Sequence, residues 1–480
     1  MKNKYFLFLI IFLIQSLFIK AQNNTVSPYS RYGLGEYNPT TFAHNAGMGG
    51  AYVALKPDSL MPIFINAGNP AAYSLIKLTC LEVGGTFTDS RFKGNNSTLH
   101  KWSANFAYGA LGFPIRSNGG ACFGIMPYSS MGYDAETSIE SSGIGSVEYK
   151  YSGSGGLNKA FLGYGFMPFQ DRLRKFRRKN LFVPDSMKHL SKTGFKIQDF
   201  GSKLLSDFSI GFNVNYLFGS LEQSSRVIYP SSINYNNTYR GRVLSLGDFT
   251  GNFGAQTAVT IDSVRQKGTN KKRHLTEKVK FTFGYFMALN NTFKVNYDAT
   301  VYNYILNGLG QEIIRDTVFS NAEQVGKITL PLEQGFGIGF KKGERVNFVA
   351  DFAITNWSKF YYLDELSNLK DNYRIACGVN FVPEKYAAGN GAFFKKLNYR
   401  LGASYQTGYI NLNNTVVSNY AITAGVGFPV GFGRLSSMVN ISAQYGQIGT
   451  TKNNLIKENY WKINFGFTFS DRWFQKFRYD

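Results

Sequence analysis

The sequence has few of the residue types that usually carry catalysis or bind metals. It contains three cysteines and four histidines among 480 residues, and neither type shows the spacing of metal ligands. The cysteines, Cys80, Cys122 and Cys377, are odd in number and scattered, which argues against a disulfide framework and favours small apolar fillers. A serine-nucleophile elbow and a phosphate-binding glycine loop are also missing. We therefore expect no metal, no cofactor and no enzymatic activity, with a barrel hydrolase whose few site residues carry no motif as the alternative.

The chain also lacks long apolar runs after its first residues. A membrane helix needs about 20 consecutive apolar residues, and no such run follows the N-terminus. Residues 1–21 combine a basic start, a short apolar block and a small final residue, Ala21, which is the pattern of a secretory signal peptide. The next residue is Gln22 and not cysteine, so a lipoprotein anchor is not expected. We predict an exported protein without membrane helices.

Charged residues are scarce, at 17% of the chain, but their balance is strongly basic, with a formal net charge of +22. No recognition helix or nucleic-acid motif accompanies this charge, so we expect anionic lipid or an acidic partner and no nucleic acid. One segment, residues 169–203, is especially rich in lysine and arginine. Strand parity places this basic insert on the periplasmic side. There it is either a solvated loop or a segment that docks on anionic head groups or a periplasmic protein.

The sequence is rich in alternating apolar and polar residues. It has 43 Phe, 31 Tyr and 51 Gly. Near the C-terminus, Trp461, Ile463, Phe465, Phe467 and Phe469 share one face of a strand, while polar or small residues occupy the other. The pattern recurs along almost the whole chain, and no helices are expected that could cover so many strands. Lipid is then the expected cover, because a closed barrel leaves no backbone group unpaired in a membrane.

The alternation predicts an all-β fold, a transmembrane antiparallel β-barrel of about fourteen strands within residues 76–480. The expected strands are residues 78–89, 102–115, 121–134, 147–167, 208–221, 251–264, 279–304, 328–341, 346–357, 373–383, 397–408, 420–430, 438–449 and 460–471. Two of these, 147–167 and 279–304, are long enough to be two strands each, so twelve or sixteen strands are alternatives. An even number places both chain ends on one side of the membrane.

Residues 22–75, which precede the first expected strand, lack the alternation. They are rich in glycine, asparagine, proline and small residues, which favour turns over sheet. Apolar residues such as Met48, Leu55 and Phe64 favour packing, since a solvated tail has little use for them. A barrel wider than eight strands cannot fill its interior with its own side chains. We therefore predict that residues 22–75 form a plug in the lumen.

Pro127 interrupts the third expected strand, residues 121–134. Proline cannot donate a hydrogen bond to a ladder and is normally confined to edges or bulges. Since a closed barrel has no free edge, we expect a local kink that opens the wall at this point. A harmless bulge near the rim is the alternative.

These segments together resemble the FadL-like outer-membrane transporters of hydrophobic compounds, in the branch found in Bacteroidota. The resemblance is carried by residues 27–35, by the small-residue run 47–51 with Gly49 and Gly50, by the element Asn69-Pro70-Ala71, and by the ending 455–474. It implies a fourteen-stranded barrel in the cell outer membrane, with an N-terminal hatch that contains these glycines and the Asn-Pro-Ala element. It also implies passive uptake of long-chain fatty acids or other hydrophobic compounds, with lateral release at a kinked third strand.

The same resemblance leaves a second function open. In that phylum the fold also serves as a scaffold or shuttle subunit of an outer-membrane protein secretion system, and fold alone does not decide function. The expected partners are a hydrophobic small molecule and outer-membrane lipids, or else a secretion-system or periplasmic protein. The sequence assigns no ligand-binding residue.

Overall fold

The computed structural model describes residues 25–57, 64–94, 97–116, 118–170, 204–230, 235–264, 277–389, 391–430, 437–471 and 473. The expected signal peptide, residues 1–21, and nearly all of the basic insert, residues 169–203, lie outside the described residues. Within the described ranges, no helix has the length and apolar character needed to cross a bilayer.

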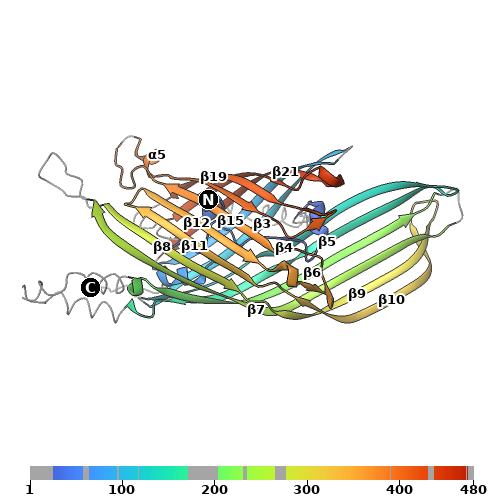
Figure 1. Ribbon diagram of the computed structural model, residues 1–480, viewed down its shortest axis with the longest axis horizontal. Coiled ribbons are helices and arrows are strands. Elements are labelled where there is room, and N and C mark those ends of the chain that lie inside the picture. Colours follow the sequence, from blue (N-terminus) through green and yellow to red (C-terminus); the bar gives the residue numbers. More distant parts are fainter. Residues whose placement is uncertain are drawn as a thin grey trace, which may run out of the picture.

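Long antiparallel strands form the wall (Figure 1). They are β2 (Thr79–Lys93), β3 (Thr98–Arg116), β4 (Gly119–Ser141), β5 (Gly145–Phe166), β6 (Ser209–Ile228), β7 (Asn237–Val264), β8 (Glu277–Ala288), β9 (Thr292–Leu306), β10 (Glu312–Thr329), β11 (Glu333–Lys342), β12 (Val346–Thr355), β15 (Asn372–Phe381), β16 (Asn398–Gln406), β19 (Asn419–Val430), β20 (Ser437–Ile448) and β21 (Lys457–Asp471). The short elements are η1 (Pro28–Arg31), β1 (Glu36–Tyr37), α2 (Ala43–Ala46), η2 (Pro70–Leu75), η4 (Trp357–Lys359), β13 (Tyr361–Tyr362), β14 (Glu365–Leu366), α5 (Ala392–Lys396), β17 (Asn411–Leu412), β18 (Thr415–Val416) and η5 (Lys452–Asn454).

The sheet closes into a barrel of fourteen strands, as the alternation predicts. Its first long strand, β2, pairs with its last, β21, along the full length of both. β8 and β9 are two segments of one strand, and so are β10 and β11, because β8 pairs with β11, β9 pairs with β10, and β7 pairs with both β8 and β9. The expected strand 279–304 is thus one strand with a break, and 147–167 is the single strand β5.

The sequence prediction missed parts of two strands. β7 begins at Asn237, well before the expected start at residue 251, and most of β10 was not expected at all. These stretches stand beyond the apolar band, where the outer face meets water and the inner face packs in part against the buried apolar cluster, as Leu244 and Ile328 do. The strict apolar–polar alternation of a lipid-facing strand is therefore not required there.

The outer face of the barrel has the pattern of a lipid-facing surface. Its outward side chains are large, apolar and exposed, among them Phe106, Phe123, Leu162, Phe212, Phe283, Ile338, Leu401, Ile422 and Phe465. Inward positions on the same strands are buried and mostly polar, including Asn213, Gln256, Asp351, Asn380, Arg400, Asn440 and Asn464. This is the reverse of a soluble sheet, and it is the arrangement that a bilayer favours.

One part of the wall is much taller than the rest, as the right-hand side of Figure 1 shows. β4, β5, β6 and β7 have 23, 22, 20 and 28 residues, whereas β11, β12 and β15 have 10 each. A barrel strand needs about 9–11 residues to cross a bilayer. We call β4–β7 with β9 and β10 the tall wall, and the end toward which it extends the external end, because both ends of the barrel sheet lie at the opposite, internal end.

Charged pairs cross the outer face of the tall wall above the apolar band. Lys150 on β5 lies within 3.6 Å of Glu136 on β4 and within 3.2 Å of Glu148 on its own strand. On β6 the guanidinium of Arg226 contacts Glu312 at 3.2 Å and stacks over the ring of Tyr239 on β7. Such cross-strand pairs suit a sheet that stands in water and not in lipid.

Candidate functional site: the plugged lumen and the open side of the barrel

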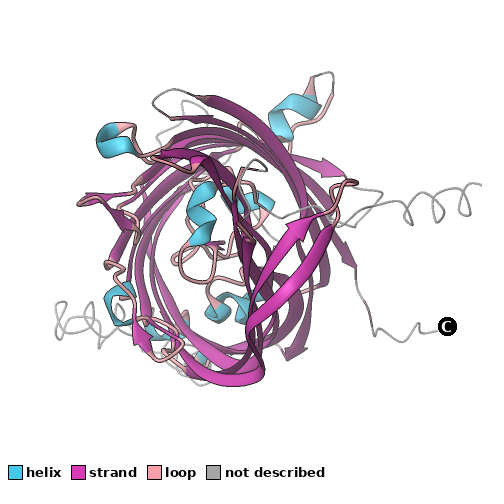
Figure 2. Ribbon diagram, turned by 90° about the vertical axis from the view of Figure 1, so that its right-hand side faces the viewer, coloured by secondary structure: helices cyan, strands magenta, loops and turns pink. Residues whose placement is uncertain are grey.

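Short helices and loops lie inside the ring of strands (Figure 2), and contacts with wall side chains show that the N-terminal segment is among them. Wall side chains bind its backbone directly. Asp351 on β12 accepts hydrogen bonds from the N–H groups of Tyr52 and of Val53, the latter at 2.7 Å. Gln256 on β7 donates to the carbonyl of Val53 at 2.8 Å, and Glu82 on β2 accepts from the N–H of Ile65 at 2.7 Å. Buried wall groups thus hold the plug from several sides.

The plug residues singled out by the sequence all lie at these wall contacts. The N–H of Gly49 donates to Thr423 Oγ1 on β19 at 2.9 Å, and the carbonyl of Gly50 accepts from Arg374 on β15 at 2.8 Å. Gly49 has φ of +67° and lies against Gly402 so closely that a Cβ on Gly402 would be 2.2 Å from the Gly49 nitrogen. Only glycines allow the two backbones to approach this closely.

The Asn-Pro-Ala element begins the helix η2 in the internal half of the lumen. Asn69 accepts the N–H of Ala71 at 3.2 Å, which caps η2, and its amide donates to the carbonyl of Val53 at 2.8 Å. Pro70 is the first residue of η2 and lies against Gly211 of β6, and Ala71 is fully buried. The element therefore ties two turns of the plug together and rests on the wall.

The external half of the lumen is filled by apolar side chains. η4 and the loops around β13, β17 and β18 fold inward onto η1 and the inner faces of β4, β5, β6, β7, β9 and β10. The buried members include Leu34, Met131, Leu157, Leu217, Leu244, Phe293, Ile328, Trp357, Phe360, Tyr409 and Ile410. The Trp357 and Tyr409 rings stack with centroids 4.5 Å apart. This apolar cluster and the plug together occupy the straight path along the barrel axis.

The wall is open on one side, between β3 and β4. The two strands pair only from Arg116 opposite Gly119 up to Gly109 opposite Ile125, although β3 begins at Thr98 and β4 continues to Ser141. Both strands keep their other neighbours, β2 and β5, over most of their length. The gap begins within the apolar band. Phe106, an outward and exposed apolar residue of β3, lies just past Gly109, the last residue of β3 that pairs with β4. We call this interruption the β3–β4 gap.

Bulges on both strands mark the start of the gap. On β3, the register with β2 skips Ala107, and on β4 the register with β5 skips Tyr128. Pro127 stands directly before Tyr128 and two residues beyond Ile125, the last partner of β3. Bulges bend a strand and proline offers no N–H to a neighbour. The structure thus places Pro127 at the rim of the gap.

The plug covers a short part of the exposed edge of β4. Glu36 and Tyr37, which form β1, pair with Ser130 and Ser129. The N–H of Asn38 donates to the carbonyl of Tyr128 at 3.0 Å. β4 therefore exchanges its ladder partner at this level, from the wall strand β3 to the plug strand β1.

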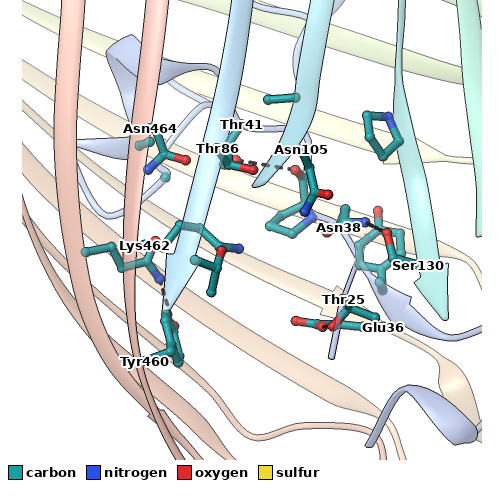
Figure 3. A pocket seen from close by; sticks show the side chains of 18 of the residues that line it. Thr25, Glu36, Asn38, Thr41, Thr86, Asn105, Ser130, Tyr460, Lys462 and Asn464 are labelled. Atoms are coloured by element: carbon teal, nitrogen blue, oxygen red, sulfur yellow. Dashed lines mark hydrogen bonds between the residues drawn. The ribbon is translucent and has the colours of Figure 1, made fainter. Parts of the chain in front are cut away.

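A cavity of about 1460 Å³, open to solvent, lies behind the gap between the plug and β2, β3, β20 and β21 (Figure 3). Its lining is mainly hydroxyl and amide groups: Thr41, Thr86, Thr88, Ser90, Ser103, Asn105, Ser404, Gln406, Asn419, Gln444, Tyr460 and Asn464. The charged lining residues are Glu36, Arg374, Glu458 and Lys462, and Phe106, Met126 and Pro127 line it toward the gap. The cavity is a polar chamber with an apolar side entrance.

A second cavity of about 630 Å³ lies across the plug, against β5 to β8, β11 and β12. Glu333 on β11 accepts the hydroxyls of Tyr37 at 3.1 Å and Tyr52 at 3.3 Å, and Lys159 on β5 donates to Thr40 at 3.1 Å. These bonds all join wall to plug, so we assign this cavity a structural role.

The described residues contain no group of three or more histidine, cysteine or acidic side chains that could hold a metal ion. Cys80, Cys122 and Cys377 are free thiols, and the first two are buried. The residues that hold the plug, such as Asp351 and Gln256, were not predicted from the sequence. Their signal was a polar or charged residue at an inward position of a strand, which is costly at membrane depth unless it is paired.

A comparison with protein families matches residues 1–173 and 196–480 to the BamG family. The chain belongs to the BamG family. No curated protein sequence matches this BamG-family chain. Among solved structures, it is similar to the toluene transporter TbuX of Ralstonia pickettii, with 11% identity, coverage of 92% of this chain and 99% of that chain, and a TM-score of 0.50.

Two further solved structures are similar at lower TM-scores. A FadL homologue of Pseudomonas aeruginosa has 12% identity, coverage of 91% and 98%, and a TM-score of 0.46. The toluene transporter TodX of P. putida has 13% identity, coverage of 92% and 100%, and a TM-score of 0.47. At such low identity, the likeness of the BamG-family chain to TbuX establishes a shared FadL-like barrel fold and nothing about substrate.

Proposed function

We propose that this protein is a passive, non-enzymatic channel of the outer membrane that exchanges hydrophobic compounds through the side of its barrel. The observation that carries the proposal is the β3–β4 gap. Unpaired backbone groups at membrane depth are costly unless they line a wet or protein-filled space. A gap that is framed by two bulges and Pro127, and that leads into a cavity, supports a membrane-facing opening.

Lateral exchange also follows from the energetics of apolar molecules. The plug and the apolar cluster occupy the axial path, so the side of the barrel offers the shorter route. An apolar molecule released into water must be rehydrated at a cost of about 0.8 kcal/mol per CH₂, whereas one released into the bilayer is not. We propose long-chain fatty acids as substrates, and membership of the Bacteroidota branch of FadL-like barrels.

The direct test is to block the gap with a bulky side chain. Ala107 is the bulged residue of β3 and lines the cavity, so Ala107→Trp should fill the opening. Ala104 faces outward on the same strand and is exposed, so Ala104→Trp is the matched control. We expect Ala107→Trp to slow uptake of pyrene-labelled dodecanoate into proteoliposomes several-fold, with the control at the wild-type rate. Equal uptake by both variants would refute the proposed route.

A second candidate function is a binding scaffold for another protein, and one observation favours it. β10 pairs with β9 on one side but, on the other, only Ile328 and Thr329 pair, with β13. Among the described strands, the rest of β10 is a free edge, and its Ile314, Val318 and Val325 are 57%, 59% and 66% exposed. A long edge with exposed apolar residues is a template for strand addition by a partner.

Placing charges on that edge separates the two functions. Ile314→Lys with Val318→Lys should block strand addition, because lysine on an edge opposes pairing. Val243→Lys, within the same wall on β7, adds charge away from the edge. If the scaffold function is right, a stoichiometric protein that co-purifies from detergent-solubilised membranes is lost only with the edge variant. If the co-purifying protein is still bound by the edge variant, β10 is not the site of strand addition by a partner.

A further inference from the structure

A groove of about 440 Å³, open to solvent, lies on the outer face of the barrel and not in its lumen. The residues that line it come from three neighbouring strands: Asp89 and Arg91 of β2, Tyr445 of β20, and Asn459 and Trp461 of β21. Their neighbours along the chain, such as Ser90 and Tyr460, are buried and line the lumenal cavity. Because side chains alternate along a strand, the five lining residues point outward. We call this site the β2–β21 groove.

The groove lies where the apolar band of the outer face ends. Phe465, four residues closer to the internal end of β21, is an exposed apolar residue of that band. At the groove itself, the rings of Trp461 and Tyr445 are 4.9 Å apart, and Trp102 of β3 stands opposite Asp89. Tryptophan and tyrosine gather where a barrel crosses from hydrocarbon to head groups. The groove therefore faces the head groups of the external leaflet.

Basic side chains stand at the groove and beside it, toward the external end. Arg91 is exposed and forms no hydrogen bond or ion pair within the described part of the chain. Lys93 of β2 is in register with Lys457 of β21, and like charges directly opposite each other destabilise a sheet. The carboxylate of the groove, Asp89, already contacts the ring of His100. A bound anion would relieve the repulsion between the two lysines, and phosphate matches the planar donors of a guanidinium.

The remaining groups of the groove suit a sugar ring. Trp461 is 53% exposed and presents an aromatic surface on which the apolar face of a sugar can pack. The amide of Asn459 both donates and accepts hydrogen bonds, and Asp89 has a second carboxylate oxygen, so both match sugar hydroxyls. A phospholipid with a small head group would use the cations and leave these groups unmatched.

We infer that the β2–β21 groove binds a phosphorylated glycolipid of the external leaflet, with Arg91 at the phosphate and Trp461 against the sugar ring. The acyl chains of such a lipid lie along the apolar band, over Ile441, Ile463 and Phe465. The site is on the outside of the barrel, so it goes beyond the proposed channel and does not depend on passage through the β3–β4 gap.

The test uses the full-length protein in dodecyl maltoside, with binding followed by native mass spectrometry. The probes are diphosphorylated lipid A, the same lipid A after enzymatic removal of its phosphates, and phosphatidylglycerol. We expect the phosphorylated lipid A to bind at least about tenfold more tightly than the dephosphorylated form, and more tightly than phosphatidylglycerol. Equal binding of the two lipid A forms, or binding of phosphatidylglycerol as tight as that of lipid A, would overturn the inference.

Substitution of Arg91 assigns the phosphate preference to the groove. Arg91→Gln should lower the affinity for phosphorylated lipid A at least about tenfold and bring it near that of the dephosphorylated form. Lys294→Gln, which removes an exposed positive charge on β9 in another part of the wall, is the matched control and should bind as the wild type does. Heat-dependent gel mobility confirms the barrel in each variant. Unchanged binding by Arg91→Gln, or an equal loss in Lys294→Gln, would show that the groove does not hold the phosphate.

Substitution of Trp461 tests the sugar contact. Trp461→Leu should weaken both forms of lipid A several-fold and leave phosphatidylglycerol unaffected, because only the glycolipids present a sugar ring to Trp461. Phe465→Leu, an aromatic loss within the apolar band of the same strand, should leave the order of the three affinities unchanged. A loss in Phe465→Leu as large as in Trp461→Leu, or an equal loss for phosphatidylglycerol, would reduce the site to unspecific contact with acyl chains and contradict the inference.

Discussion

The tall wall meets the rest of the barrel at two seams, and only one of them is sealed. At the seam between β10 and β12, the last residues of β10, Ile328 and Thr329, pair with β13, which folds back from the β12 end. Leu330 and Phe360 are buried there in the apolar cluster. At the seam between β3 and β4, the two residues of β1 and the neighbouring Asn38 replace a short part of the missing ladder, and a polar cavity lies behind them.

The comparison shows how the same local chemistry leads to different outcomes. Each seam has a proline, Pro127 on β4 and Pro331 between β10 and β11. At both places the proline has no N–H to donate to a neighbouring strand. The two seams differ in the segments that pack against them. An apolar loop closes the seam between β10 and β12, whereas polar wall and plug groups border a cavity at the seam between β3 and β4. The open seam is therefore a built feature of the fold and not a by-product of strand length.

Removing the plug should have the largest effect, because the plug closes the internal lumen and its strand β1 covers part of the open seam. Deleting residues 25–75 is expected to raise leakage of sucrose through proteoliposomes by more than any other change considered. Heat-dependent gel mobility of the deleted form controls for barrel closure. Wild-type leakage from a closed barrel would show that the plug does not occlude the lumen.

Exchanging the prolines tests whether the seams differ in function. Pro127→Val restores an N–H at the rim of the open seam, and we expect it to extend the β3–β4 ladder and slow dodecanoate uptake several-fold. Pro331→Val, at the sealed seam, is the matched control and should leave uptake unchanged. Equal effects of the two substitutions, or none from either, would contradict the assignment of the outlet to Pro127.

Opening the sealed seam should reduce stability without creating a route. Phe360 is fully buried, and Phe360→Ala should lower the free energy of unfolding by about 3–5 kcal/mol. Phe394→Ala, at a site that is 67% exposed, is the control. We expect protease to cleave segment 356–371 in the first variant only, with uptake unchanged in both. Faster uptake in Phe360→Ala would place a second path at this seam.

The smallest expected effect concerns pH and the internal end of the plug. Burial lowers the pKa of Lys56 from 10.5 to about 7, the nearby Lys280 lowers it further, and Asp207 opposes the shift. Between these two values the unfolded chain binds more protons than the folded one, so stability rises with pH from about 7 to 10.5.

Protection of the plug from protease measures this pH dependence. Protection should be greater at pH 9 than at pH 7 in the wild type, and Lys56→Met should weaken the difference. An identical pH profile in the wild type and in Lys56→Met would show that the buried amine does not limit plug stability.

The sequence was sufficient for the barrel, the strand number and the plug, because the alternation of Trp461 to Phe469 and the turn chemistry around Asn69 are local signals. Pro127 lies two residues beyond the last β4 partner of β3, but the kink and the outlet expected there stay a prediction. The two seams could not be predicted from the sequence, because they depend on which distant segments of the chain come into contact. Nothing around Tyr361 predicts that it pairs with Thr329.

Hydrogen exchange at the two seams tests the central claim most directly. On the full-length protein in micelles, we expect the amides of residues 99–108 that face β4 to exchange rapidly, while those of residues 109–116 and of Ile328 and Thr329 stay protected. Protection of all β4-facing amides of β3 to the same degree as residues 109–116 would mean that the ladder is closed, and the account of an open side would be wrong.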